Sequence, residues 1–233
     1  MKLSVNNVAK RYGDFYAVSD VSFTANQGEI VGFLGPNGAG KTSTLRMMVT
    51  YLPPSSGDIT VGGFSVRTKG DEVRKLIGYL PETPPLYPEL TVKEYLSFVA
   101  RLKGVKDVKE AVERAIGKCF LEEVTNKLCG YLSKGFKQRV GIAQAIIHDP
   151  EVVILDEPTS GLDPKQIIEI RELIKSLGKG KVVVLSTHIL PEVSMVCDKV
   201  VIINKGKTVV EKKLTELEKS LEETFLESLR GDV

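Results

Sequence analysis

The chain has 233 residues, of which 32 are Lys or Arg and 30 are Asp or Glu, so its formal net charge is +2. A charge this close to zero gives no general attraction for nucleic acid, whose binding needs many clustered cations. There is also no acidic tail to gather basic partners. The composition, 42% hydrophobic and 27% charged, is that of an ordinary globular protein with one domain, or with one domain and an inserted subdomain. Any phosphate chemistry must therefore depend on a local site.

The sequence lacks the features of a membrane-spanning or disulfide-bonded protein. The longest apolar runs, such as residues 152–155 and 182–185, contain four residues each, whereas crossing a bilayer takes about 20. The first residues, MKLSVNNVAKRYG, do not form the apolar stretch of a secretory signal. The three cysteines, at positions 119, 129 and 197, have no CxxC spacing. We therefore expect a cytoplasmic protein without a disulfide framework or a zinc site.

Residues 1–84 have the pattern of short strands separated by turns. Residues 21–25 alternate between apolar and polar types, which is the period of a half-buried strand. Compact apolar runs follow at residues 30–34 and 59–61. A segment rich in Pro, Ser and Gly precedes the second run, so we expect a loop there after a helix that begins near Thr42.

Residues 85–148 have a helical pattern instead. The segments TVKE at 91–94 and DVKE at 107–110 are capping boxes, in which a side-chain oxygen and a Glu three residues later satisfy free amides at a helix start. A third helix is expected to begin at Ser133 and to end before Pro150. The middle of the chain is thus predicted to be helical and to interrupt two strand-rich parts.

Strands and helices alternate again from residue 149. Asp163 as cap and Pro164 in the first turn predict a helix start. Strands are expected at residues 152–155, 182–185 and 200–203, with a hairpin strand ending near residue 211. Leucines at helical spacing predict a helical tail packed on the body. The predicted divisions are residues 1–84 and 149–211 as two parts of one core, 85–148 as an insertion and 212–233 as a tail.

A glycine-rich loop at residues 35–42, GPNGAGKT, fits the pattern GxxxxGK[ST] and follows a predicted strand directly. Its glycines let successive backbone amides point inward, and the following helix adds its positive end, so the loop suits a polyanionic phosphate. Lys41 is expected to reach the outer phosphates, and the Thr42 hydroxyl to bind Mg²⁺. The predicted nucleotide-binding residues here are Gly35, Pro36, Asn37, Gly38, Ala39, Gly40, Lys41, Thr42 and Ser43.

Two adjacent carboxylates end the apolar strand in VVILDEPTSGLD, at residues 152–163. Buried acids are costly unless a cation or a reaction requires them. Asp156 is expected to bind magnesium, directly or through water, and Glu157 to polarise a water for attack on the outer phosphorus. The alternative is that Asp156 caps a loop and Glu157 is solvated; the nearby phosphate loop favours the functional interpretation.

Taken together, these motifs resemble the ATP-binding cassette (ABC) ATPases. GPNGAGKT, LSKGFKQRVGIAQA at 132–145, VVILDEPTSGLD and STH at 186–188 occur in that family's order, and the resemblance covers essentially the whole chain. It implies an α/β fold: a P-loop NTPase core with a mixed sheet, an N-terminal antiparallel β part and an inserted helical subdomain. YLPETPPLYPELTVKEYL at 79–96 resembles the branch of exporters whose ATPase and membrane subunits are separate chains.

The resemblance also assigns roles to single residues. Tyr12 matches the aromatic that stacks on adenine, although an ordinary half-buried tyrosine is the alternative. Ser133 and Gly135 match the signature motif, which in the family faces the nucleotide held by a second subunit; Ser133 is also expected to be a helix cap. The signature residues in this chain are Ser133, Lys134, Gly135 and Phe136.

Two further positions, His188 and Asp163, follow from the same comparison. His188 resembles the family's switch histidine, which contacts the γ-phosphate and orients water. Asp163 matches the D-loop residue that connects the two sites of a dimer, and it is also expected to cap a helix. The other histidine, His148, is expected only to cap a helix end and to interact with its dipole.

The chain departs from the family at two places. The usual signature LSGGQ reads LSKGF here, so Lys134 and Phe136 replace a small residue and an amide, which alters contacts with a partner nucleotide. Glu82 stands where a glutamine is usual. A carboxylate can still bind Mg²⁺ or its water, but it adds negative charge near Asp156 and Glu157. A solvated loop acid is the alternative for Glu82.

We therefore expect an ATPase subunit on the cytoplasmic face of a cell membrane, with ATP and Mg²⁺ as ligands. Its expected partners are transmembrane subunits and a second cassette, either a copy of itself or a paralogue, that together enclose two MgATP. One rival is a cassette ATPase that acts on nucleic acid or ribosomes, but the long insertions and basic stretches typical of those are missing. Another is a small-molecule kinase, which LSKGFKQR and the paired Asp and Glu disfavour.

Overall fold

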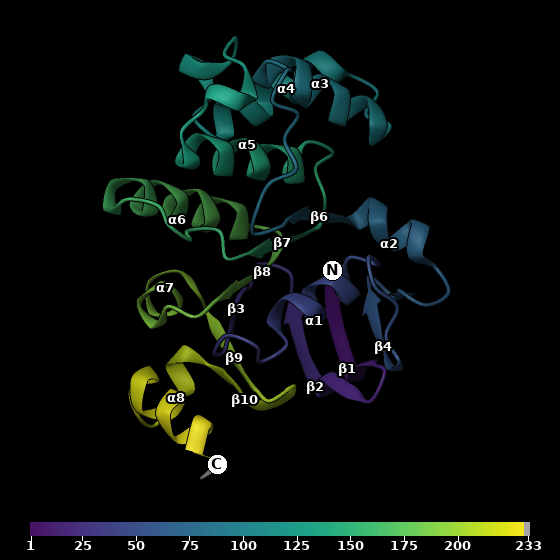
Figure 1. Ribbon diagram of the computed structural model, residues 1–233, viewed down its shortest axis with the longest axis vertical. Helices are drawn as coiled ribbons and strands as arrows, with labels where there is room; N and C mark the ends of the chain where they lie inside the picture. Colours follow the sequence, from purple (N-terminus) through teal and green to yellow (C-terminus); the bar gives the residue numbers. More distant parts are fainter. Residues whose placement is uncertain (231–233) are drawn as a thin grey trace.

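The computed structural model describes residues 1–230 and has one ten-stranded mixed sheet as its framework (Figure 1). The strands are β1 (Lys2–Tyr12), β2 (Phe15–Asn26), β3 (Ile30–Leu34), β4 (Ser56–Val61), β5 (Phe64–Ser65), β6 (Ile77–Leu80), β7 (Val152–Asp156), β8 (Val182–Thr187), β9 (Lys199–Asn204) and β10 (Lys207–Lys213). Their order across the sheet is β5-β4-β1-β2-β10-β9-β3-β8-β7-β6. The expected α/β class with a mixed sheet is confirmed.

Five neighbouring strands, β9, β3, β8, β7 and β6, are parallel. They read as continuous apolar runs because helices cover both of their faces. In β7, Val153 and Leu155 point into one core, with the helices α5 and α6, while Val152 and Ile154 point into another, with α1. Since the carboxyl ends of parallel strands meet at one edge, the loops after these strands converge there.

The N-terminal strands form the antiparallel part. β1 pairs with β2 and with β4, and β4 pairs with β5. Val21, Phe23 and Ala25 are buried at every second position of β2, as the alternation predicts. β10 joins the two parts, because it pairs antiparallel with β9 and contacts β2 at Lys207 and Asp20.

The helices are α1 (Lys41–Met48), α2 (Gly70–Leu76), α3 (Val92–Leu102), α4 (Val108–Lys118), α5 (Lys134–Ile146), α6 (Pro164–Gly178), α7 (Leu190–Val196) and α8 (Leu221–Arg230). The teal helices α3, α4 and α5 lie at one end of the molecule, and α8 lies at the other (Figure 1). Thr91 and Glu94 form a full capping box at α3. At α4, only the Asp107 side chain accepts the expected bond, from the Glu110 amide at 2.9 Å. Within residues 1–230, no helix is both long and apolar enough to span a bilayer.

Two helices, α2 and α7, were not expected from the sequence, which predicts no helix between the strands at residues 182–185 and 200–203. α2 lies within residues 1–84, where the pattern predicts strands and turns. Its seven residues bury only Val73, so the helix has almost no apolar periodicity to detect. Asp71 and Glu72 in its first turn and Arg74 and Lys75 in its last match the helix dipole instead.

The predicted helical tail begins later than expected. Residues 214–216 form a single 3₁₀ turn, and the Leu214 amide bonds to the Asp198 carbonyl at 2.9 Å. The helix α8 begins only at Leu221, where Ser220 and Glu223 satisfy each other's backbone amides. Leu221 is buried against the sheet, which agrees with a packed tail. Residues 231–233 of the predicted tail lie outside the described residues.

Candidate nucleotide site

The loop between β3 and α1 has a backbone that only glycine permits at several positions. Gly38 and Gly40 have φ values of +78° and +102°, in the left-handed region that other residues rarely adopt. A Cβ on Gly40 would stand 2.6 Å from the Ala17 carbonyl oxygen, and one on Gly35 would stand 2.5 Å from that of Ile203. The glycines are therefore required for the loop to curl tightly against its neighbours.

The start of α1 leaves donors available for an anion. Gly40 is the N-cap and has no side chain to accept the free amides of the first turn. Lys41 is 7% exposed, and its ammonium group donates to the carbonyls of Gly35 and Pro36 at 2.8 and 3.4 Å. It also lies 3.5 Å from Glu157 Oε1. The loop thus holds the buried ammonium group of Lys41 beside the start of α1.

Asp156 ends β7 directly beside Ser186 of β8. The Ser186 hydroxyl donates to Asp156 Oδ1 at 2.6 Å, and the Thr42 hydroxyl donates to the same oxygen at 3.4 Å. Asp156 is 1% exposed. A buried carboxylate next to a threonine hydroxyl is the oxygen-rich pair that Mg²⁺ prefers in phosphate-loop proteins. These two residues are brought together as the sequence predicts.

Glu157 has an unusual backbone for a non-glycine residue, with φ of +47°. Such conformations cost free energy and persist where surrounding bonds fix them. The Glu157 amide donates to the Ser186 carbonyl at 3.2 Å and to its hydroxyl at 3.0 Å. As a result, Glu157 Oε2 lies 3.0 Å from His188 Nδ1. The two residues predicted to act on water are in direct contact.

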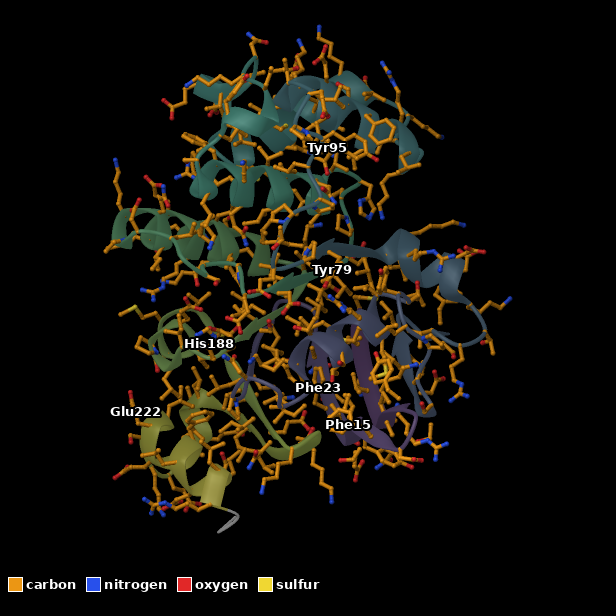
Figure 2. All side chains as sticks on the ribbon, in the orientation of Figure 1. Phe15, Phe23, Tyr79, Tyr95, His188 and Glu222 are labelled. Atoms are coloured by element: carbon orange, nitrogen blue, oxygen red, sulfur yellow. The ribbon has the colours of Figure 1, made fainter. Side chains whose placement is uncertain are left out.

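A cavity of about 560 Å³ joins these groups. It is lined by Phe15, Ala17, Asn37, Gly38, Gly40, Lys41, Thr42, Ser43, Glu82, Glu157, Ser160 and His188. His188 lies near α7 and Phe15 near the end of the β1–β2 hairpin (Figure 2). Asp156 is buried behind Thr42, whereas Glu82 is exposed and at the same time faces the cavity. The phosphate loop, the acidic strand end, Glu82 and His188 therefore share one space.

The aromatic residue at this cavity differs from the expected one. Phe15 lines the cavity, and Tyr12 is not part of the lining that the described residues form. The Tyr12 ring instead has the Lys10 ammonium 5.3 Å from its centroid. Tyr12 and Phe15 are paired across the hairpin, so their side chains share one face, and Arg11 pairs with Tyr16 in the next register position. Strand alternation after the turn could have indicated Phe15, because it shares a face with Tyr12.

The signature residues lie elsewhere in the chain. Ser133 caps α5 by accepting the Phe136 amide at 3.4 Å. Gly135 and Phe136 line a separate cavity of about 230 Å³ with Asp163 and Gln166. A Cβ on Gly135 would stand 2.5 Å from the Gln166 side chain, so glycine permits this contact between α5 and α6. Asp163 caps α6 in a full capping box. The cavity of this group and the nucleotide cavity have no lining residue in common.

The two signature substitutions have local explanations. The Arg139 guanidinium lies 5.4 Å from the centroid of the partly buried Phe136 ring, and Arg139 also forms an ion pair with Glu169. A cation at this distance from an aromatic face is attracted to it. Lys134 is exposed, and its ammonium group lies over Gly161, where a Cβ would meet it at 2.2 Å. Both side chains remain on the surface that carries Asp163.

His148 makes a contact different from the expected helix cap. Its Nε2 lies 3.2 Å from the Ile77 carbonyl of β6. Burial, and next the positive charge of Lys103, lower the pKa of His148 to about 4. The ring is therefore neutral near pH 7, and it links the end of α5 to the sheet.

A strand, a glycine loop and a helix, followed by a buried acidic strand end, define the chain as a phosphate-loop nucleotide-binding protein. The family model described as "ABC transporter" matches residues 18–160. A second model, described as "AAA domain, putative AbiEii toxin, Type IV TA system", matches only residues 130–195. The chain belongs to the ABC transporter family, and it is an ATP-binding, ATP-hydrolysing subunit.

Relatives and solved structures agree with this assignment. The bacitracin transport ATP-binding protein BcrA of Bacillus licheniformis is 40% identical, over 93% of this chain and 71% of its own. The SkfA peptide export ATP-binding protein SkfE of Bacillus subtilis (strain 168) is 41% identical, over 94% and 92%. The structure of an ATP-binding subunit of an ABC transporter is 31% identical with a TM-score of 0.88, covering 98% of this chain and 99% of its own.

A further solved structure is a dimeric ATP-binding cassette in a post-hydrolysis state, bound to ADP and Pi. It is 27% identical with a TM-score of 0.81, and the match covers 91% of this chain and 98% of that one.

Proposed function

We propose that this chain supplies the energy for an exporter whose membrane subunits are separate chains, and that it works on the cytoplasmic face of the membrane. The observation that carries the proposal is the single cavity shared by Lys41, Glu157 and His188. Export is supported by relatives named for bacitracin transport and for peptide export. The cargo itself would be bound by the membrane subunits.

In this proposal, the phosphate groups of ATP lie in the loop at residues 35–42. The free amides at the start of α1 and the Lys41 ammonium group bind the phosphate oxygens. Thr42 and Asp156 hold Mg²⁺, because their oxygens already approach each other at 3.4 Å, and Glu82 faces the same space. Bound Mg²⁺ neutralises phosphate charge and draws electron density from the bond to be cleaved.

Glu157 is proposed as the general base for the attacking water. A base must lie within hydrogen-bond reach of the proton that it takes, and Glu157 lines the same cavity as the phosphate loop, with its Oε1 3.5 Å from the Lys41 ammonium group. His188 fixes the Glu157 carboxylate through its Nδ1 at 3.0 Å and presents the rest of its half-exposed ring to the γ-phosphate. The pair therefore orients the water and the outer phosphate together.

The site is proposed to be completed by a second cassette, a copy or a paralogue. Gly135, Phe136 and Asp163 line a cavity that shares no residue with the nucleotide cavity of their own chain, and Ser133 and Lys134 stand at the start of the same helix, α5. The positive start of α5 suits a γ-phosphate. In a head-to-tail pair, each chain presents this surface to its partner's cavity, so two MgATP are enclosed.

The base of the nucleotide is proposed to stack on the aromatic end of the β1–β2 hairpin. Phe15 is 66% exposed at the cavity, and Tyr12, 47% exposed, shares its face. We assign the direct contact to Phe15, with Tyr12 extending the same surface. Stacking requires only a flat aromatic face, so it holds the base without reading its polar edge.

The membrane subunits are proposed to contact the junction between the core and α5. A cavity of about 340 Å³ is lined there by Tyr51, Tyr79, Gln144 and His148, and β6 leads from this cavity directly to Glu82. A partner seated there would sense the loop that faces the nucleotide. Gentle detergent extraction of tagged protein should recover a hydrophobic chain with it; recovery of the cassette alone from membranes would contradict this part.

The whole proposal is tested by Glu157→Gln. The amide keeps the shape of the side chain but cannot accept the proton, so ATP binding should persist while turnover falls to a small fraction of the wild-type value. The variant should also accumulate as a dimer in the presence of ATP, detected by light scattering. The surface variant Lys175→Gln on α6 serves as control and should hydrolyse ATP normally. Normal turnover in the Glu157→Gln variant would exclude the assigned mechanism.

A further inference from the structure

Glu192 is a buried acid that the nucleotide cavity does not include. It lies on α7 and is 3% exposed. Its Oε2 accepts the Thr187 hydroxyl at 2.7 Å, and its Oε1 accepts the Thr159 hydroxyl. One carboxylate therefore bridges two segments that are far apart in the sequence.

Both threonines stand next to the reacting residues. Thr187 is the last residue of β8 and directly precedes His188. Thr159 follows Glu157 by two residues and precedes Ser160, which lines the cavity. The bridge by Glu192 thus connects the segment that carries the base to the segment that carries the histidine.

A second connection lies on the other side of the same pair. Ser186 donates its hydroxyl to Asp156 at 2.6 Å and accepts the Glu157 amide at 3.0 Å. Ser186 connects the two segments through its bonds to Asp156 and Glu157. Glu192 connects them through its bonds to Thr159 and Thr187. The 3.0 Å contact between Glu157 and His188 is held from both sides.

Stability alone does not explain an acid at position 192. Burying a carboxylate costs free energy even when it is hydrogen bonded, and a well-packed apolar side chain often serves a fold better. The neighbouring positions Val193 and Val196 are buried and apolar. Glu157 needs such support, because its backbone is held at φ of +47°, a conformation that relaxes when its constraints are removed.

We propose that Glu192 is a positioning residue for ATP hydrolysis: it fixes Thr159 and Thr187 so that Glu157 and His188 keep their mutual geometry. The inference rests on the proposed roles of Glu157 and His188. A residue outside the cavity thus controls the geometry of Glu157 and His188. Loss of the bridge should affect the chemical step more than phosphate binding, since the hydrogen bonds of Glu192 go to Thr159 and Thr187 and not to Lys41 or Thr42.

The test compares Glu192→Ala and Glu192→Gln in steady-state ATP hydrolysis. Glu192→Ala should lower kcat about tenfold or more, because a small misplacement of reacting groups is expensive, while KM for ATP changes less than about twofold. Glu192→Gln should recover most of kcat, since an amide oxygen accepts one hydroxyl and its NH₂ donates to the other.

Val193→Ala is the matched control. Val193 is the next residue of α7, is fully buried and packs against Gly32, so its truncation weakens the same helix and leaves the bridge intact. It should lower the melting temperature without the loss of kcat. Thr159→Val and Thr187→Val, nearly isosteric, each remove one half of the bridge and should each lower kcat, which keeps the test decisive if Glu192→Ala does not fold.

The outcomes separate this inference from the proposed function. If Glu157→Gln abolishes hydrolysis but Glu192→Ala and both threonine variants keep the wild-type kcat, the positioning role is wrong and the proposed function stands. An equal fall of kcat in Val193→Ala and Glu192→Ala, at equal loss of melting temperature, also overturns it by leaving only a structural role. If the wild-type chain binds no ATP, the proposed function itself fails.

Discussion

Lys41 and Glu157 have opposite charges and lie 3.5 Å apart at the bottom of the cavity, each almost completely buried. Two charges in such a place are tolerated because each has further partners: Lys41 has the carbonyls of the loop, and Glu157 has His188. In the proposed function, a bound phosphate would offer Lys41 a stronger anionic partner and free Glu157 for its proposed action on water. Lys41 and Glu157 are thus the residues expected to exchange partners on binding.

At the same scale, three aromatic residues within five positions give a sharp test of base binding. Phe15→Ala should weaken ATP binding about tenfold, because stacking of a base on an aromatic side chain contributes about 1–3 kcal/mol. Isothermal titration calorimetry with ATP, and with GTP for comparison, measures the change. Tyr16→Ala is the control, since Tyr16 is 53% exposed but sits at the adjacent hairpin position with its side chain on the opposite face.

The result for Tyr12→Ala decides how the aromatic face is shared. A smaller loss of ATP affinity in Tyr12→Ala than in Phe15→Ala agrees with the lining of the cavity, which includes Phe15. A large loss for Tyr12→Ala together with an unchanged Phe15→Ala variant would return the stacking role to Tyr12.

Among the elements, β6 and α5 are packed unusually closely. Gly78 in the middle of β6 faces the backbone of α5, where a Cβ would stand 2.0 Å from the Ala145 carbonyl oxygen. Such a close approach requires glycine within a strand. Because β6 leads to Glu82 and α5 begins at the signature residues, this contact joins two functional segments rigidly.

This packing predicts opposite effects for two Gly→Ala substitutions. Gly78→Ala should lower the free energy of unfolding by about 2 kcal/mol or more, because α5 must shift away from β6. Gly117→Ala, in α4, should leave stability unchanged or raise it by up to about 1 kcal/mol, since the nearest atom is 3.9 Å from the new Cβ. Chemical denaturation measures both. A tolerated Gly78→Ala substitution would contradict the close contact.

At the scale of the whole molecule, the phosphate loop and the signature residues line two different cavities. The loops after β3, β7, β8 and β6 converge at the carboxyl ends of parallel strands and form the nucleotide cavity. The signature residues belong to the start of α5, in the group of helices at one end of the molecule (Figure 1). In the proposed function, the first group binds the chain's own nucleotide and the second is presented to the phosphate held by another chain.

Stability of the whole fold should depend on pH through His148. Its pKa is about 4 in the folded protein, against 6.5 as the usual value. Above pH 6.5 the ring is neutral in both states. As pH falls from 6.5 toward 4, the unfolded chain takes up a proton that the folded protein excludes, so stability is lost across this window. Because the ring is only partly buried, solvent screening limits the loss to about 2 kcal/mol.

Melting temperatures at pH 7 and pH 5 test this effect. The wild-type protein should lose stability over this interval, and His148→Gln, whose amide can still donate to the Ile77 carbonyl, should lose less. Thr50→Ser, a change in the same cavity lining that adds or removes no titratable group, is the control and should keep the wild-type pH dependence. Identical curves for the wild type and His148→Gln would show that this ring does not contribute.

The sequence alone determined the features that depend on local chemistry. GPNGAGKT and LDE specify the phosphate loop and the acidic strand end, and Ser133, Asp163 and Pro164 mark helix starts, because turns and caps depend on residues close in the chain. The apolar runs of β7 and β8 indicated buried strands, and the order of the motifs indicated the family. The sequence did not predict α2, whose ends are marked by charges and not by an apolar pattern. It also predicted too early a start for α8, because the contact of Leu214 with Asp198 decides the structure there.

Only the tertiary structure decided how distant segments combine. It brought Phe15, and not Tyr12, to the cavity lining, although the two side chains share one face of the hairpin. It connected Thr159 to Thr187 through Glu192, and it set Gly78 against the backbone of α5. Such contacts depend on packing between elements that lie far apart along the chain, for which short-range patterns carry no information.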